Sequence, residues 1–188
     1  MSKKPQTKRR RPGLQWAAFL APVLAIAGII IAAGALSGSD EEPTAADDVA
    51  LDFTLTDTDG GTVRLAEILE ERDALLYFSM GVGCDGCFLQ IPEIAAELDN
   101  RGIEFLPIMV DRADWLAAEA ERLQVGMPIV VDFDRTVSEA YGMVGQHGHG
   151  DRPSHSFALV RQSGELAWVR HYVEMFVPSE QFFAEMPG

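Results

Sequence analysis

The most constraining feature of this 188-residue sequence is a short apolar run followed closely by both cysteines of the chain. The run, ALLYF, covers 74–78, and the stretch SMGVGCDGCF then holds Cys84 and Cys87 with two residues between them. An uninterrupted apolar run of this kind is typical of a strand that is buried on both faces. Across 84–99 the apolar side chains recur at helical spacing. The cysteines are therefore predicted to lie where a buried strand passes into a helix.

Strand and helix patterns alternate along 50–188, which we interpret as one α/β domain. Turn signals separate the first two strands at 59–61 and the last two at 162–165. Pro92 falls inside the helix that follows the cysteines, and we expect it to kink that helix. The expected strands are 51–56, 62–65, 74–78, 103–110, 128–131, 156–160 and 166–170, and the expected helices are 66–72, 84–99, 113–123, 137–141 and one that begins at Pro178.

The first part of the chain has the composition of a membrane anchor. Residues 14–36 carry no charge and are long enough to cross, as a helix, a bilayer with a hydrocarbon core of about 30 Å. Six basic residues and no acidic residue lie in 1–13, so we expect this end in the cytoplasm and the rest of the chain outside it. Residues 37–49 are small and acidic, as in a flexible linker. The alternative is a cleaved signal peptide with a small-residue cleavage site at 33–35.

Charge is distributed very unevenly along the chain. The formal net charge is −14, although 1–13 is basic. The remainder carries nine arginines, no lysine and all 29 acidic residues. Such an acidic surface repels the phosphate backbone of DNA and RNA, so we predict no nucleic-acid partner.

The spacing of the two cysteines favours a dithiol/disulfide couple. Cys84 is expected at a helix N-terminus, where unpaired N–H groups and the helix dipole favour the thiolate. Cys87, one turn further along, is expected to face the core and to resolve a mixed disulfide. A purely structural disulfide is an alternative, although so short a loop gains little chain-entropy stabilisation. A zinc site would need further ligands from histidine or carboxylate side chains.

The sequence resembles the thioredoxin superfamily, in particular its TlpA/ResA-like and redoxin (AhpC/TSA-related) membrane-anchored branch. The features shared with that superfamily are LDFTL followed by DGG at 51–61, the cysteine pair after an apolar strand, Pro92 after the second cysteine, and PSHSFALV at 153–160. The resemblance implies a three-layer α/β sandwich, in which helices flank a central mixed sheet. It also implies thiol–disulfide oxidoreductase activity.

The sequence departs from the family pattern around the cysteines. Gly83 and Gly86 stand where the family usually has tryptophan and proline, and Asp85 places an anion beside the thiols, which should oppose thiolate formation. The family's cis-proline corresponds to Pro153, which is displaced by one residue, so a trans loop segment is the alternative. By the same resemblance, we expect Pro153 and His155 to support the active site and the bound substrate.

Two further functions remain open at this point. A peroxiredoxin-like peroxidase would need the pattern P-x-x-x-T-x-x-C, but the positions of proline and threonine relative to Cys84 hold Tyr77 and Gly81. A copper-binding module similar to Sco-type chaperones would use Cys84, Cys87 and His155, since thiolate and imidazole ligands suit copper. The family spacing for that module is one residue longer than the spacing found here.

We therefore predict an extracytoplasmic thiol–disulfide oxidoreductase, tethered to the membrane by its N-terminal helix. Cys84 and Cys87 are its catalytic residues, and the Cys84–Cys87 disulfide is its redox centre without any other cofactor. Its expected partners are protein thiols or disulfides and a membrane dithiol carrier that supplies electrons.

Overall fold

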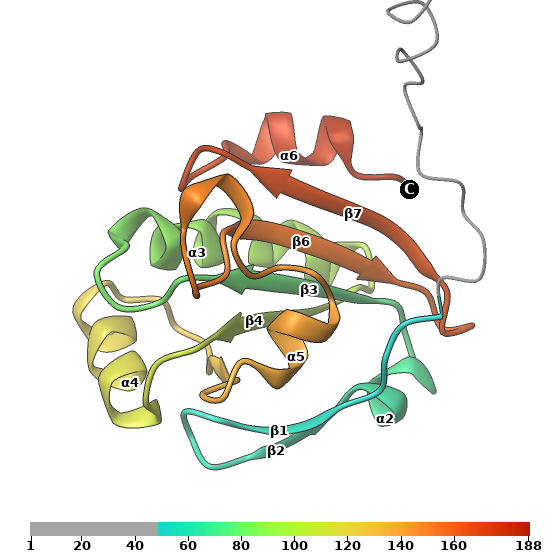
Figure 1. Cartoon of the computed structure of the whole chain (residues 1–188). Helices are drawn as coiled ribbons and strands as arrows, with labels where there is room; N and C mark the ends of the chain where they lie inside the picture. Colours follow the sequence, from blue (N-terminus) through green and yellow to red (C-terminus); the bar gives the residue numbers. More distant parts are fainter. Residues whose placement is uncertain (1–48) are drawn as a thin grey trace, which may run out of the picture. The chain divides into compact units, whose positions relative to one another are not determined.

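The computed structural model describes residues 49–188 (Figure 1). The predicted basic segment 1–13, the predicted anchor 14–36 and the predicted linker up to residue 48 lie outside the described residues. Among the residues that are described, none of the helices has the length and apolar character needed to cross a membrane.

Seven strands of the described region form one mixed sheet, with the spatial order β2-β1-β5-β4-β3-β6-β7. The strands are β1 (Thr54–Asp57), β2 (Thr62–Arg64), β3 (Ala74–Ser79), β4 (Glu104–Met109), β5 (Val130–Val131), β6 (His155–Val160) and β7 (Leu166–Tyr172). Strands β3, β4 and β5 are parallel, whereas β6 runs antiparallel to β3 and β7 antiparallel to β6. The carboxyl ends of β3, β4, β5 and β7 therefore meet the amino end of β6 at one edge of the sheet, which we call the carboxyl edge.

Helices cover both faces of this sheet (Figure 1). They are α2 (Leu65–Leu69), α3 (Asp85–Asn100), α4 (Ala113–Arg122), α5 (Thr136–Ala140) and α6 (Ser179–Glu185), with a short 3-10 turn at Gln146–Gly148. All six residues of β3 are buried. On one face Tyr77 packs in a cluster with residues of α3, α4 and α6, and on the other Phe78 packs in a cluster with residues of α2 and α5. The predicted three-layer α/β sandwich with a mixed sheet is thus confirmed for this part of the chain.

The ends of the elements follow local hydrogen bonding. The strand predicted at 128–131 is reduced to β5, because Pro128 has no N–H to donate and Ile129 instead exchanges hydrogen bonds with Thr58. Helix α3 continues through Pro92, which removes the N–H that would otherwise bond to the carbonyl of Phe88. Strand β6 begins at His155, one residue before the predicted start, and this brings the histidine into the sheet.

Candidate functional site

Both cysteines lie at the carboxyl edge, where β3 passes into α3. Gly81 and Gly83 have φ values of +81° and +94°, in the left-handed region that favours glycine, and they turn the chain from strand to helix. Cys84 is the N-cap of α3, and its Sγ accepts the N–H of Cys87 at 3.2 Å. The two sulfurs form a disulfide with an S–S distance of 2.06 Å. The predicted Cys84–Cys87 pairing is therefore present in the structure.

The two sulfurs differ in their access to solvent. Cys84 retains 6% of its surface. Cys87, on the buried face of α3, is 0% exposed and packs in the core. The Sδ of Met175 lies 3.9 Å from the Cys87 Sγ and covers it from the loop after β7. A thiolate at the first turn of a helix is stabilised by the unpaired backbone N–H groups and the dipole. Of the two cysteines, only Cys84 retains exposed surface.

An ion pair fastens the cysteine loop, residues 80–84, to the rest of the carboxyl edge. Asp111, just after β4, accepts the N–H of Val82 at 2.7 Å and pairs with Arg152 at 2.6 Å from Nη2 to Oδ1. Arg152 also donates to the carbonyl of Met80. A Cβ on Gly81 would lie 2.5 Å from the Asp111 carboxylate, so this approach requires glycine. Three loops that are far apart in the sequence are joined here by one carboxylate and one guanidinium.

The charge of Asp85 is balanced by a neighbouring helix. The Asp85 carboxylate pairs with Arg122 at the end of α4, which also pairs with Glu119. The hydrogen bonds that Arg122 donates to Asp85 and to Glu119, the former having the larger effect, raise the pKa of Arg122. The sequence led us to expect that Asp85 would oppose thiolate formation at Cys84. Arg122 offsets that anion, a compensation that the sequence around the cysteines does not reveal.

His155 is completely buried next to the disulfide. The Tyr77 hydroxyl donates to the Cys87 carbonyl at 3.0 Å and lies 3.3 Å from the His155 Nδ1. Both the Cys87 carbonyl and the His155 ring thus lie within hydrogen-bonding distance of one hydroxyl. Burial lowers the pKa of His155 to about 4, against a smaller opposing effect of the Met175 backbone. His155 is therefore neutral at physiological pH.

Pro153 lies in the loop before β6, two residues ahead of His155. The chain contains no cis peptide bond between residues 49 and 188, so the trans alternative applies to Arg152–Pro153. Pro153 is buried and forms an isolated bridge with Val144. Its neighbour Arg152 is the residue that reaches the cysteine loop.

The remaining histidines lie in β7 and in the loop before β6. The Nδ1 of His171 lies 2.8 Å from the Ser156 hydroxyl, and burial, together with the charge of His147, lowers the pKa of His171. His147 and His149 belong to the loop before β6. Within 49–188, no group of three or more His, Cys, Asp and Glu side chains is arranged to hold a metal ion.

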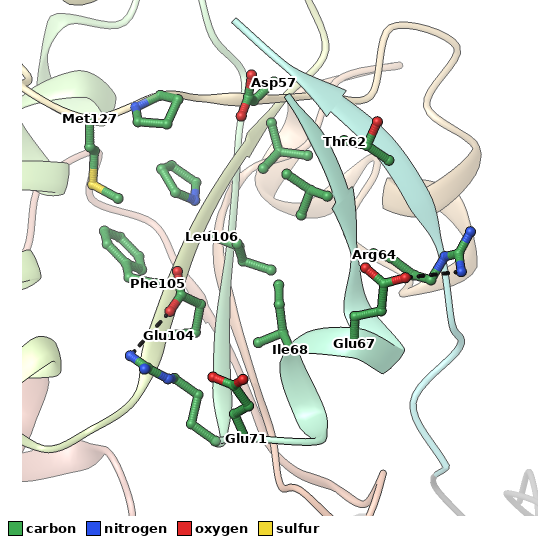
Figure 2. A pocket seen from close by; sticks show the side chains of 15 residues that line it. Asp57, Thr62, Arg64, Glu67, Ile68, Glu71, Glu104, Phe105, Leu106 and Met127 are labelled. Atoms are coloured by element: carbon green, nitrogen blue, oxygen red, sulfur yellow. Dashed lines mark hydrogen bonds and ion pairs between the residues drawn. The ribbon is translucent and has the colours of Figure 1, made fainter. Parts of the chain in front are cut away.

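A pocket away from the cysteines opens between β4, the β1–β2 hairpin and α2 (Figure 2). Its rim carries the ion pairs Arg64–Glu67, at 3.1 Å, and Arg72–Glu104, at 3.4 Å. It is lined by the amino-terminal half of β4, whereas the disulfide lies beyond the carboxyl end of the neighbouring parallel strand β3. Neither cysteine nor any histidine lines it.

Sequence reasoning identified the cysteines and His155 but missed the residues that surround them. Asp111, Arg152, Arg122 and Met175 lie between 24 and 88 residues from Cys87 along the chain and reach the site only through the fold. The one available signal was Asp111, an acidic residue that directly follows the strand predicted at 103–110, because such positions lie at the carboxyl edge of a parallel sheet.

The sequence of the chain is similar to those of known redox proteins. A family model described as the AhpC/TSA family matches residues 46–169. Peroxiredoxin Bcp of Escherichia coli (strain K12) is 31% identical over 107 residues, which span 55% of this chain and 68% of that relative.

Two solved structures show the same architecture. Peroxidoxin BcpB from Mycobacterium tuberculosis aligns with a TM-score of 0.55 and 23% identity, covering 66% of this chain and 83% of that chain. A secreted Mycobacterium tuberculosis disulfide oxidoreductase, described as homologous to E. coli DsbE, aligns with a TM-score of 0.57 and 16% identity, covering 74% and 96%. At these identities the likeness supports the fold alone, and the predicted thioredoxin-like fold is confirmed.

Proposed function

Because the chain belongs to the AhpC/TSA family of thioredoxin-like redox enzymes, we propose that it exchanges disulfides with protein substrates through Cys84 and Cys87. The observation that supports this most directly is the unequal burial of the two bonded sulfurs. Cys84, at the N-terminus of α3, retains 6% of its surface, while Cys87 retains none. A disulfide exchanger needs this arrangement, with one sulfur to meet the substrate and another to release it.

The exchange proceeds in two displacements. In the reduced enzyme the Cys84 thiolate attacks a substrate disulfide, so that a Cys84–substrate bond forms and one substrate thiolate leaves. Cys87, once deprotonated, attacks the Cys84 Sγ, and the second substrate thiolate leaves as the Cys84–Cys87 disulfide forms. Two electrons pass from the enzyme to the substrate, and the two substrate thiolates take up protons. With an oxidised enzyme and a substrate dithiol, the same steps run in reverse.

The protein environment supports the first displacement. The helix terminus favours negative charge on Cys84, and the pairing of Asp85 with Arg122 offsets the nearest competing anion. The Asp111–Arg152 ion pair holds the cysteine loop in place, so the nucleophile is presented in one position.

The proposal includes the location of the enzyme. The uncharged segment 14–36 acts as a membrane anchor, and the basic residues of 1–13 keep the N-terminus in the cytoplasm. The redox domain then works outside the cytoplasm, where disulfides persist. Electrons would reach it from a membrane dithiol carrier, and the anchor raises its effective concentration near such a partner.

Trapping of a mixed disulfide tests the proposed exchange. The purified full-length chain is incubated with a disulfide-containing polypeptide and dithiothreitol, and loss of the substrate disulfide is followed. Wild type should accelerate that loss, and Cys84→Ser should abolish the acceleration. Cys87→Ser, reduced beforehand, freed of dithiothreitol and then mixed with the substrate, should accumulate a covalent enzyme–substrate adduct through Cys84. Equal rates for wild type and Cys84→Ser would overturn the proposal.

A second candidate is peroxide reduction, which is favoured by the name of the E. coli relative at 31% identity. In that reaction the Cys84 thiolate would attack one peroxide oxygen, the O–O bond would break, and the other oxygen would leave as water or an alcohol. Cys87 would then condense with the Cys84 sulfenic acid to form the disulfide and a water molecule. The threonine and proline positions of the peroxidase motif hold Gly81 and Tyr77, which weakens this candidate. Consumption of hydrogen peroxide by the reduced chain, compared with its rate of disulfide exchange, separates the two candidates.

A further inference from the structure

The segment 173–178 between β7 and α6, which we call the strap, runs along the first turns of α3. Three residues of α3 contact the strap or the residue that follows it. Gly86 lies against the Met175 carbonyl, the Gln90 Oε1 accepts the N–H of Val177 at 2.7 Å, and the Glu93 Oε1 accepts the N–H of Ser179 at 2.8 Å. Positions 86, 90 and 93 share one face of a helix. The strap is thus fixed to α3 at successive turns.

Gly86 allows the strap to approach the disulfide. A Cβ at Gly86 would lie 2.8 Å from the carbonyl oxygen of Met175, closer than side-chain carbons come to backbone oxygens. A proline, which the family usually has at this position, would add a bulkier ring in the same space. The glycine that departs from the family pattern is therefore explained by the backbone that lies on top of it.

Met175 closes the space above the second cysteine. Its thioether lies 3.9 Å from the Cys87 Sγ, its backbone lies close to His155, and Cys87 has no exposed surface. A methionine side chain is apolar and fits irregular gaps. The contact excludes water and other solutes from Cys87 but leaves the adjacent Cys84 accessible.

We propose that Met175 is a positioning residue that shields Cys87, so that external thiols and disulfides react at Cys84 alone. Cys87 then reacts only with the neighbouring Cys84 sulfur, which keeps the mixed disulfide on Cys84 until it is resolved. This inference rests on the proposed disulfide exchange, because it assigns the order in which the two sulfurs react. The hydrogen bonds from Val177 to Gln90 and from the following Ser179 to Glu93 hold the strap against α3 independently of the disulfide.

Alkylation of Cys87 measures the shielding directly. The reduced full-length chain carrying Cys84→Ser is treated with iodoacetamide, which forms a thioether with the Cys87 thiolate and releases iodide. In this background Met175→Ala should accelerate alkylation by about tenfold or more, since the buried thiol no longer needs a local opening to react. Met175→Leu keeps most of the side-chain volume, so its alkylation rate in the same background should remain close to that of the chain with Met175. Gly86→Ala should accelerate the reaction as well, because it displaces the Met175 carbonyl.

Two control variants distinguish shielding from general loosening of the fold. Val173→Ala alters an exposed side chain of the same strap, and Val160→Ala removes buried volume on the opposite face of the sheet. Neither variant should change the alkylation rate of Cys87 under conditions where the chain stays folded, as judged by circular dichroism.

A second measurement uses the protein with both cysteines. In reduced wild type, brief alkylation followed by peptide mass spectrometry should find the label on Cys84, whereas Met175→Ala should share it between Cys84 and Cys87. Unchanged alkylation of Cys87 in Met175→Ala would overturn the shielding role, even if disulfide exchange is observed. Shielded Cys87 in a chain without exchange activity would instead overturn the proposed function and leave the shielding intact.

Discussion

The Asp111 carboxylate and the Arg152 guanidinium meet at 2.6 Å between Oδ1 and Nη2, directly beside the loop that carries the cysteines. The Asp111 side chain is 7% exposed and that of Arg152 is 33% exposed, so water screens the pair only partly. Because Asp111 also accepts the Val82 N–H and Arg152 donates to the Met80 carbonyl, the pair holds the backbone on either side of Gly81. Residues from three loops therefore determine where Cys84 is presented.

Replacing Asp111 should weaken the fold and slow exchange together. Asp111→Asn keeps the size of the side chain but leaves the Arg152 charge without its partner, and we expect a loss of about 1–3 kcal/mol in unfolding free energy. Urea denaturation measures this loss. The matched control is Arg135→Ala, which breaks the exposed Arg135–Asp151 pair. It should change stability by less than about 0.5 kcal/mol, and an equal effect of both variants would contradict a special role for Asp111.

Gly81 should tolerate alanine less well than another glycine with a similar backbone. Gly81 and Gly142 have φ values of +81° and +70°, but only at Gly81 does an added Cβ meet the Asp111 carboxylate. Gly142→Ala should cost about 1 kcal/mol for the left-handed backbone alone. Gly81→Ala should cost more and should also lower the rate of disulfide exchange. Thermal unfolding of the two variants gives the comparison, and equal destabilisation would show that the carboxylate moves aside freely.

His155 should make the fold sensitive to acid. Its pKa is about 4 in the folded chain against 6.5 for the free side chain, so between these values the unfolded state binds more protons. The stability that neutral His155 provides is fully present above about pH 6.5 and is lost as the pH falls toward about 4, by a total of ~3 kcal/mol.

The variant His155→Gln isolates this contribution. The difference in unfolding free energy between wild type and His155→Gln should shrink as the pH is lowered through that window. A constant difference between wild type and His155→Gln would show that His155 has the same pKa in the folded and unfolded states, contrary to the argument from burial.

Arg122 should influence the reactivity of Cys84 through Asp85. In the Cys87→Ser background, Arg122→Ala leaves the Asp85 anion uncompensated near the thiol, so the thiolate fraction at neutral pH should fall by about twofold at low salt. Asp85→Asn should change it in the opposite direction, and both effects should diminish as salt is added. The pH dependence of alkylation at Cys84 measures the thiolate fraction. Identical pH profiles for Cys87→Ser chains with and without Arg122→Ala would show that solvent already screens the Asp85–Arg122 pair.

The sequence determined the architecture because its main signals are local. The apolar run 74–78 became β3, the helical spacing after Cys84 became α3, and the alternation of strands and helices across 50–188 gave the three-layer sandwich. The Cys84–Cys87 disulfide also follows from local spacing, since both residues lie in the first turn of one helix. These features depend on neighbours within a few residues, so a pattern in the sequence is enough to predict them.

The surroundings of the disulfide were decided by the tertiary structure alone. Nothing near the cysteines in the sequence indicates that Arg122 would balance Asp85 or that Arg152 rather than Pro153 would hold the cysteine loop. The same is true of Gly86, whose missing side chain makes room for Met175, 89 residues further along. Such contacts form where the parallel strands end at one edge of the sheet, and which side chains meet there depends on packing and register. The amino-acid sequence therefore predicts the two reacting sulfurs, while the folded chain determines which of them an incoming substrate can reach.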